Sequence, residues 1–224
     1  MHYISFFFLV LCKLLAKFFY RFDQHWYSSH QNDDWRKVKV IIILNHTSLF
    51  EPIFLRSVPT SFLWQLSKHL TLPAAEETLK RPVVGKLLKA LVPKCIPISR
   101  KYDESWDNFI NQICNQNILA IMPEGRMKRR DGLDKHGKAM DIKIGVVDIL
   151  SKINRGNILF VYSGGLHHVQ SPGDKLPKLF KTIKVNFEIT DVENYKQSFY
   201  HLDKGVYQQA IISDLQHRLN HKSP

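Results

Sequence analysis

The stretch VKVIIILNHTSLFEP, residues 38–52, decides the fold of this 224-residue chain. After Lys39 the stretch is continuously apolar as far as Leu44, which is typical of a strand buried on both faces of a parallel sheet. Polar residues follow at once, and His46 and Glu51 stand five positions apart. Because sites in α/β folds lie at the carboxyl ends of strands, the stretch predicts an α/β fold with a candidate site here.

The remainder of the chain supports an α/β fold, because apolar strand patterns alternate with amphipathic helix patterns. We expect further strands at 61–66, 94–98, 118–122 and 158–162, and an alternating edge strand at 181–189. We expect helices at 50–57, 81–92, 103–113, 141–153 and 204–219. A chain of this length is short for two cores, so the prediction is a single domain whose mostly parallel or mixed sheet is covered by helices.

The composition limits the kinds of partner. The net charge is +12 and the isoelectric point about 9.6, so the surface attracts nucleic acid, anionic lipid headgroups or phosphorylated ligands. The basic clusters lack interleaved aromatic residues, so we do not expect nucleic-acid binding. The cysteines Cys12, Cys95 and Cys114 are odd in number and lack metal-ligand spacing. They predict neither a disulfide framework nor a metal site, and they favour a reducing compartment.

The N-terminal segment ISFFFLVLCKLLAKFFYRF, residues 4–22, is apolar apart from Ser5, Lys13, Lys17 and Arg21. The run before Lys13 is too short to span a bilayer. On a helix the three cations would share one face, which predicts a helix lying in the membrane interface with its cations toward the headgroups.

The segment has two other interpretations. A signal peptide would need positive charge before the apolar run and small residues after it, and neither is present. A helix packed on the protein's own core stays open as the alternative. We therefore divide the chain into a membrane-associating helix at residues 1–27 and a domain at residues 28–224.

His46 and Glu51 are candidates for a base and its orienting carboxylate. A carboxylate bound to one imidazole nitrogen fixes the tautomer and raises the basicity of the other nitrogen, which makes a general base near neutral pH. The spacing alone arises easily by chance, and a capping or core histidine is the alternative.

Two basic segments follow strands in the same way. Arg100 ends the segment VPKCIPISR and would clamp a phosphate or an oxyanion. The segment IMPEGRMKRRDG, residues 121–132, runs from a strand into Glu124, Gly125 and Arg126, where a glycine allows close backbone approach and cations would hold a phosphate. A solvated basic surface is the alternative for both segments.

Taken together, these blocks resemble the glycerolipid acyltransferase family, which includes the glycerol-3-phosphate and 1-acylglycerol-3-phosphate acyltransferases. The resemblance covers roughly residues 38 to 165, and no single motif carries it. The blocks follow the family's order: His-x4-acid, Pro-x-x-Gly with IPISR, PEGR, IKIGVVDIL and ILFVYSGG.

The resemblance implies a role for each matching position. His46 would be the general base, oriented by Glu51 where the family usually has aspartate. Arg100 would contact the acceptor phosphate, and Glu124, Gly125 and Arg126 would line the acceptor site. The strand ILFVYSGG would border the acyl donor. The acceptor hydroxyl would attack an acyl thioester directly, without an acyl-enzyme, a metal or a cofactor.

The expected function is acyl transfer from acyl-CoA or acyl carrier protein to a lysophospholipid. The first choice of acceptor is 1-acylglycerol-3-phosphate, giving phosphatidic acid at the cytoplasmic side of a membrane with anionic lipids. The chain departs from the family at Glu51 and at Met127, which stands where the third block usually has arginine. These departures keep two alternatives open: another lysolipid acceptor, and a lipid-binding protein without catalysis on the same scaffold.

Overall fold

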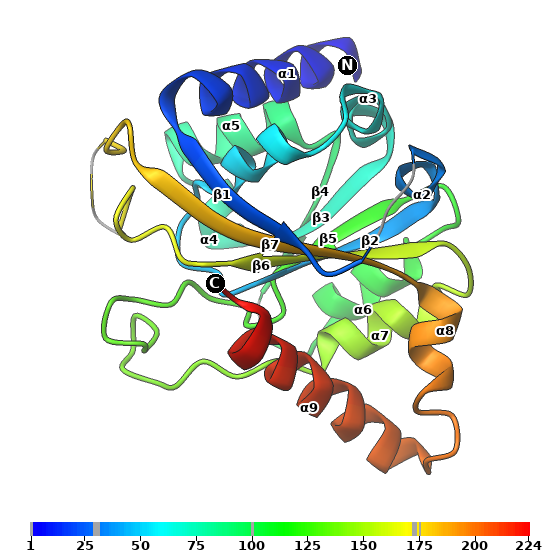
Figure 1. Ribbon diagram of the computed structural model, residues 1–224. Coiled ribbons are helices and arrows are strands. Elements are labelled where there is room, and N and C mark those ends of the chain that lie inside the picture. Colours follow the sequence, from blue (N-terminus) through cyan, green and yellow to red (C-terminus); the bar gives the residue numbers. More distant parts are fainter. Residues whose placement is uncertain (1, 29–31, 100, 172–173, 175) are drawn as a thin grey trace.

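The computed structural model describes residues 2–28, 32–99, 101–171, 174 and 176–224 (Figure 1). Within this described part, the strands form one seven-stranded sheet in the order β1-β7-β6-β2-β5-β3-β4. Strand β7 runs antiparallel to β6 and the other pairs are parallel, so the sheet is mixed, as expected. The strands are β1 Arg21–Trp26, β2 Val38–Leu44, β3 Leu70–Ala75, β4 Lys94–Ile98, β5 Ile118–Ile121, β6 Asn157–Ser163 and β7 Thr182–Asp191.

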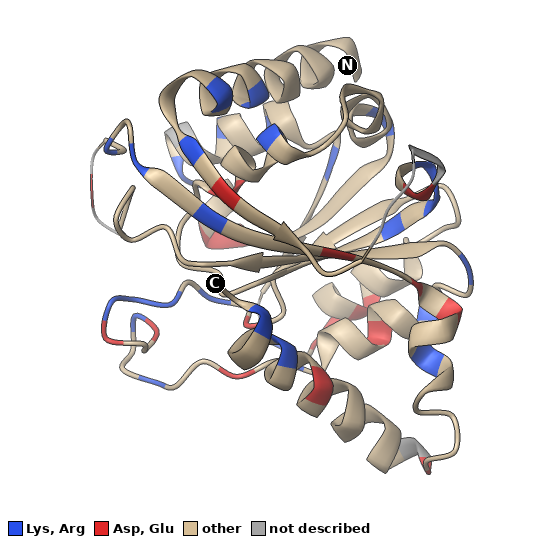
Figure 2. Cartoon of the chain, in the orientation of Figure 1, with Lys and Arg blue, Asp and Glu red and all other residues tan. Residues whose placement is uncertain are grey.

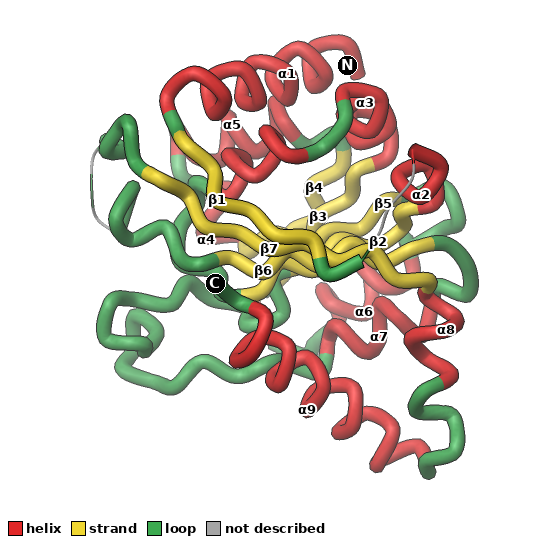
Figure 3. The backbone as a smooth tube through the Cα atoms, in the orientation of Figure 1, coloured by secondary structure: helices red, strands yellow, loops and turns green. Residues whose placement is uncertain are grey.

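Helices cover both faces of the sheet (Figures 1 and 3). One face carries α1 His2–Phe19, the 3₁₀ helix η1 Glu51–Ser57, α3 Thr60–His69 and α5 Pro82–Leu91. The other face carries α6 Glu104–Asn111, α7 Gly145–Lys152, α8 Val192–Gln197 and α9 Lys204–Lys222. The short helices are α2 Asn32–Lys37 and α4 Glu76–Leu79.

Strand β2 lies inside the sheet and is buried on both sides. Ile41 packs into the apolar cluster under α1 and α3, whereas Val40 and Ile42 pack into the cluster under α6 and α7. The predicted double-sided burial of this strand is therefore confirmed, and the α/β class of the fold with it.

The structure corrects two sequence predictions of strands. Residues 61–66 belong to helix α3 rather than to a strand, and Phe62, Leu63 and Leu66 are buried at helical spacing. The strand follows as β3, where Pro73 and two alanines hid the strand pattern. Residues 181–189 form β7 as a strand but not as an edge, because β1 pairs along its outer side.

The N-terminal segment 1–27 contributes both α1 and the edge strand β1, so part of it belongs to the sheet. Helix α1 lies across η1, α3 and α5 and buries the short or slender side chains of Ser5, Leu9 and Ala16. The hydroxyl of Ser5 donates a hydrogen bond of 2.6 Å to the carbonyl oxygen of Leu91 in α5. Helix α1 is thus docked on the core of the domain.

The outer face of α1 is apolar and exposed, and it includes Tyr3, Ile4, Phe7, Leu14 and Phe18. The helix is long and apolar enough to cross a membrane by length and composition alone.

The prediction that three cations share one face of a helix is wrong, because Lys13 is bound by the core of the domain and Arg21 lies beyond the end of α1. The ammonium group of Lys13 donates to the carbonyl oxygen of Val58 at 2.6 Å, and Arg21 lies in β1.

Candidate active site

The loop after β2 begins with a tight turn at Asn45. Its φ of 65° lies in the left-handed region, where asparagine is tolerated better than most residues. The side-chain amide of Asn45 donates a 2.8 Å hydrogen bond to the carbonyl oxygen of Ser163 at the end of β6. In the same loop, the hydroxyl of Thr47 accepts a 2.8 Å bond from the backbone N–H of Leu166. These bonds fasten the loop that carries His46 to the neighbouring strand.

The structure brings His46 and Glu51 together. The imidazole Nδ1 lies 2.8 Å from Glu51 Oε1, and both side chains are buried. Helix η1 starts at Glu51 with Pro52 in its first turn, which turns the carboxylate back toward the loop. The backbone N–H of Ser48 also donates to Oε1 at 3.3 Å. A glutamate therefore reaches the imidazole at this spacing.

Glu124 binds the backbone of the same loop. Its two carboxylate oxygens accept hydrogen bonds from the backbone N–H groups of Asn45, at 2.8 Å, and His46, at 3.0 Å. The residue is almost fully buried, and burial raises the pKa of its carboxyl group against the opposing effect of these two bonds. Glu124 also borders the cavity described below. It therefore both lines the site and holds the backbone of His46 through a hydrogen bond.

Gly125 and Arg126 form the turn after β5. Gly125 has a φ of 71°, and a side chain there would approach the Lys143 Cγ within 3.9 Å. The guanidinium of Arg126 is paired with the buried carboxylate of Asp134. Hydrogen bonds from the backbone N–H of Lys138 and from Arg126 hold the pKa of Asp134 well below its usual range. Arg126 is thus oriented by an ion pair, and more than a third of its side chain is exposed.

Arg100, the other residue expected at a phosphate, lies outside the described residues. Its neighbour Lys101 borders the cavity together with Lys138 and Lys143, which sequence reasoning did not single out. Lys143 lies in the quoted block IKIGVVDIL, and its backbone N–H donates to the carbonyl oxygen of Pro123 at 2.9 Å. The position of this lysine inside a quoted block was the signal that could have identified it.

A cavity of about 830 Å³ opens at His46, Glu51 and Glu124. Its polar lining includes the cations Arg126, Lys138 and Lys143 and the carboxylates of Asp134 and Asp141. The rest of the lining is mostly apolar and comes largely from the sheet and from the helices of the α1 face. The apolar lining includes Leu9, Phe62, Leu66, Leu88, Leu91 and Phe187. The volume lies within the usual range of small-molecule sites. This lining suits a ligand with an anionic head and a long apolar tail, whose reacting group would lie beside the imidazole.

Comparisons with known proteins identify a family and a similar fold. A family model described as Acyltransferase matches residues 27–162, which is more than half of the chain. Among solved structures, the chain is similar to the 1-acyl-sn-glycerophosphate (LPA) acyltransferase PlsC from Thermotoga maritima. The identity is 18%, the TM-score is 0.53, and the match covers 95% of this chain and 80% of the other. The search of curated proteins gives no match.

Proposed function

Because the chain belongs to the Acyltransferase family, we propose that it transfers a fatty acyl group from a thioester to a lysophospholipid, with 1-acylglycerol-3-phosphate as the first candidate acceptor. The product would be phosphatidic acid. The observation that carries the proposal is the His46–Glu51 pair in the wall of a cavity that is also lined by Arg126, Lys138 and Lys143 and by many apolar side chains.

The chemistry needs a base and no nucleophilic side chain. Glu51 holds Nδ1 of His46, so the acceptor's proton would pass to Nε2 as its hydroxyl oxygen attacks the thioester carbonyl. When the tetrahedral intermediate collapses, the C–S bond breaks and the thiolate takes the proton back from the imidazolium. The acyl group moves directly from the thioester sulfur to the acceptor oxygen, so no acyl-enzyme forms. The anionic intermediate would be stabilised by donors at the site.

The acceptor phosphate has several cations within the site. Lys143 runs beside Gly125, and Lys138 and Arg126 border the same cavity. Arg100 keeps its proposed role at the phosphate on the family resemblance alone. Lysine and arginine bind phosphate well because both donate several charge-assisted hydrogen bonds.

The acyl chain would occupy the apolar part of the cavity, which runs beneath α1. A donor on coenzyme A or on acyl carrier protein would deliver it. The exposed outer face of α1 would attach the enzyme to the membrane that supplies the acceptor.

Thiol release with lysophosphatidic acid and a palmitoyl or oleoyl thioester tests the proposal. We expect wild type to be active, His46→Ala to lose about 1,000-fold in kcat, and Glu51→Asp to keep measurable activity. Glu104→Gln, at an exposed position in the first turn of α6, is the matched control and should equal wild type. Wild type that releases no thiol with any donor or lysolipid would refute the function.

A second acceptor class is favoured by one observation. Met127 replaces the usual third-block arginine, and the neighbouring Arg126 is held in position by Asp134. A headgroup larger than phosphate could then be accepted. Competition between lysophosphatidic acid and other lysophospholipids decides between the two, because a strong preference for lysophosphatidic acid removes this alternative.

The other alternative is a lipid-binding protein without catalysis, motivated by Glu51 in place of aspartate. The 2.8 Å contact between Glu51 and His46 supports catalysis instead, and loss of turnover in His46→Ala with lipid binding retained would exclude this alternative.

A further inference from the structure

The chain from 176 to 181, which we name the Phe180 loop, lies against the end of α1. The backbone N–H of Phe180 donates to the carbonyl oxygen of Phe19 at 2.8 Å. The backbone N–H of Arg21 donates to the carbonyl oxygen of Lys181 at 3.1 Å. The rings of Phe19 and Phe180 have centroids 5.8 Å apart. Two segments about 160 positions apart in sequence thus form one continuous corner of the molecule (Figure 1).

This corner exposes large apolar side chains. Phe18 is 76% exposed, Phe180 71% and Leu176 79%, and Leu179 is exposed as well. The corner continues the exposed apolar face of α1. Monomeric soluble proteins seldom expose apolar side chains in such density, and a contiguous patch of this kind marks an interaction surface.

The backbone at Phe180 adds an independent observation. Its φ of 58° lies in the left-handed region, which is costly for an aromatic residue. Such strain persists where the surrounding structure imposes it, and here β7 and the end of α1 hold the chain on both sides. The ring gains little burial in return within the chain, since most of it faces outward.

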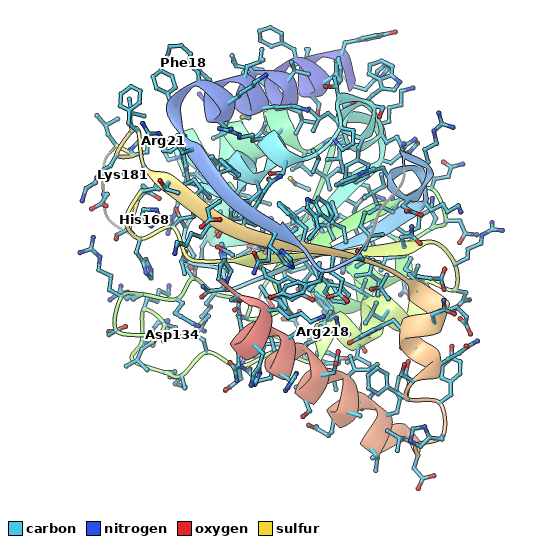
Figure 4. The ribbon with its side chains drawn as sticks, in the orientation of Figure 1. Phe18, Arg21, Asp134, His168, Lys181 and Arg218 are labelled. Atoms are coloured by element: carbon cyan, nitrogen blue, oxygen red, sulfur yellow. The ribbon has the colours of Figure 1, made fainter. Side chains whose placement is uncertain are left out.

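Cations surround the apolar corner. Lys17, Arg21, Lys178 and Lys181 are all exposed, and none takes part in an ion pair with another described residue. Figure 2 shows Lys and Arg on α1, at the start of β1 and before β7, and Figure 4 shows Phe18, Arg21 and Lys181 at the same end. Apolar side chains ringed by unpaired cations match a bilayer with anionic headgroups.

We propose that the Phe180 loop is a second membrane contact, which inserts into an anionic phospholipid bilayer together with the exposed face of α1. The inference rests on the membrane attachment proposed above for α1. A protein attached through one helix in the membrane interface can rotate about the axis of that helix. A second contact from the start of β7 fixes that rotation, because β7 and β1 are paired strands of the sheet that carries the site.

The test is sedimentation of the full chain with vesicles of phosphatidylcholine, with and without phosphatidylglycerol. Phe180→Asn removes the ring and suits the left-handed backbone, so the fold should be kept. We expect about tenfold weaker binding to the anionic vesicles. Lys181→Gln should weaken binding about fivefold on anionic vesicles only. Tyr200→Asn is the matched control, because it removes an exposed ring from the segment between α8 and α9, away from α1. This variant should bind vesicles like wild type.

Each outcome decides the inference. Equal binding of Phe180→Asn and wild type, with equal thermal unfolding temperatures, would overturn it and leave α1 as the contact. If wild type binds no vesicles, both the attachment through α1 and this inference fail. Acyl transfer to a detergent-solubilised lysolipid, measured in parallel, keeps that failure separate from failure of the enzymatic function. Self-association that is lost in Phe180→Asn, without vesicle binding, would reassign the corner to a second copy of the chain.

Discussion

Replacing Glu124 by glutamine distinguishes a residue that positions the base from one that contacts the acceptor. The carboxylate accepts from two backbone N–H groups, those of Asn45 and His46, with one oxygen for each. Glutamine offers one oxygen and one NH₂ group, so one backbone N–H loses its acceptor and faces a donor instead. The shape and volume of the side chain are otherwise conserved.

The loss can be worked from these two bonds. A hydrogen bond to a charged group contributes about 1.5–3 kcal/mol, so losing one, in a site too buried for water to compensate, costs about 2 kcal/mol. If this free-energy loss raises the energy of the transition state by displacing His46, kcat drops about 30-fold. The KM for the lysolipid should change less than threefold, because substrate binding does not use this bond.

The assay is steady-state thiol release at varied lysolipid, with thermal unfolding measured on the same samples. Glu124→Asp is the informative companion, because it keeps the charge and both acceptors but withdraws them by one methylene. We expect it to be less impaired than Glu124→Gln. A KM raised tenfold or more at unchanged kcat would refute the reasoning, since it would place Glu124 against the acceptor, as the family resemblance implied.

Three further predictions follow from single contacts. Leu88→Trp fills the apolar part of the cavity, so the ratio of activity with short-chain to long-chain thioesters should rise, and an unchanged ratio would put the acyl chain elsewhere. Ser5→Ala leaves the carbonyl oxygen of Leu91 without its donor and should lower the free energy of unfolding by about 1–2 kcal/mol in urea titrations, whereas no loss would mean that α1 docks without this bond. Asp134→Asn should lower the unfolding temperature at pH 7, and it should raise the KM for lysophosphatidic acid because Arg126 loses the partner that orients it. The folded-state pKa of Asp134 lies below its ordinary 3.8, so the stabilisation is present above pH 3.8 and is lost as the pH falls further. A difference in unfolding temperature between variant and wild type that persists undiminished at pH 2 would contradict this.

The sequence predicted the elements whose patterns are local. The predictions of a strand after Lys39 and of helices at 81–92 and 103–113 each depend on a few neighbouring residues, and the structure has β2, α5 and α6 at these places. Strands β1 and β3 were missed because their sequences, RFDQHW and LTLPAA, lack the usual strand pattern. Their conformation comes from partners far along the chain, which a local pattern does not contain.

The site shows the same division. The pairing of His46 with Glu51 spans five residues, and a helix start after Ser48 suffices to predict it. The hydrogen bond between Glu124 and the backbone of His46 joins residues 78 positions apart. The pairing of Asp134 with Arg126 depends on the path of the loop after β5. Sequence reasoning placed Glu124 among the acceptor-lining residues because it identified motif membership but not contacts.

The strand order explains why these separate blocks can act on one substrate. Strand β2 lies between β5 and β6, and both neighbours are parallel to it. The chain therefore leaves all three strands at the same edge, so that His46 after β2, Glu124 after β5 and Ser163 at the end of β6 meet within hydrogen-bonding distance of one loop. A parallel sheet in another order would keep every motif and separate them in space. The order of the blocks along the chain thus identifies the family, whereas the order of the strands makes the site.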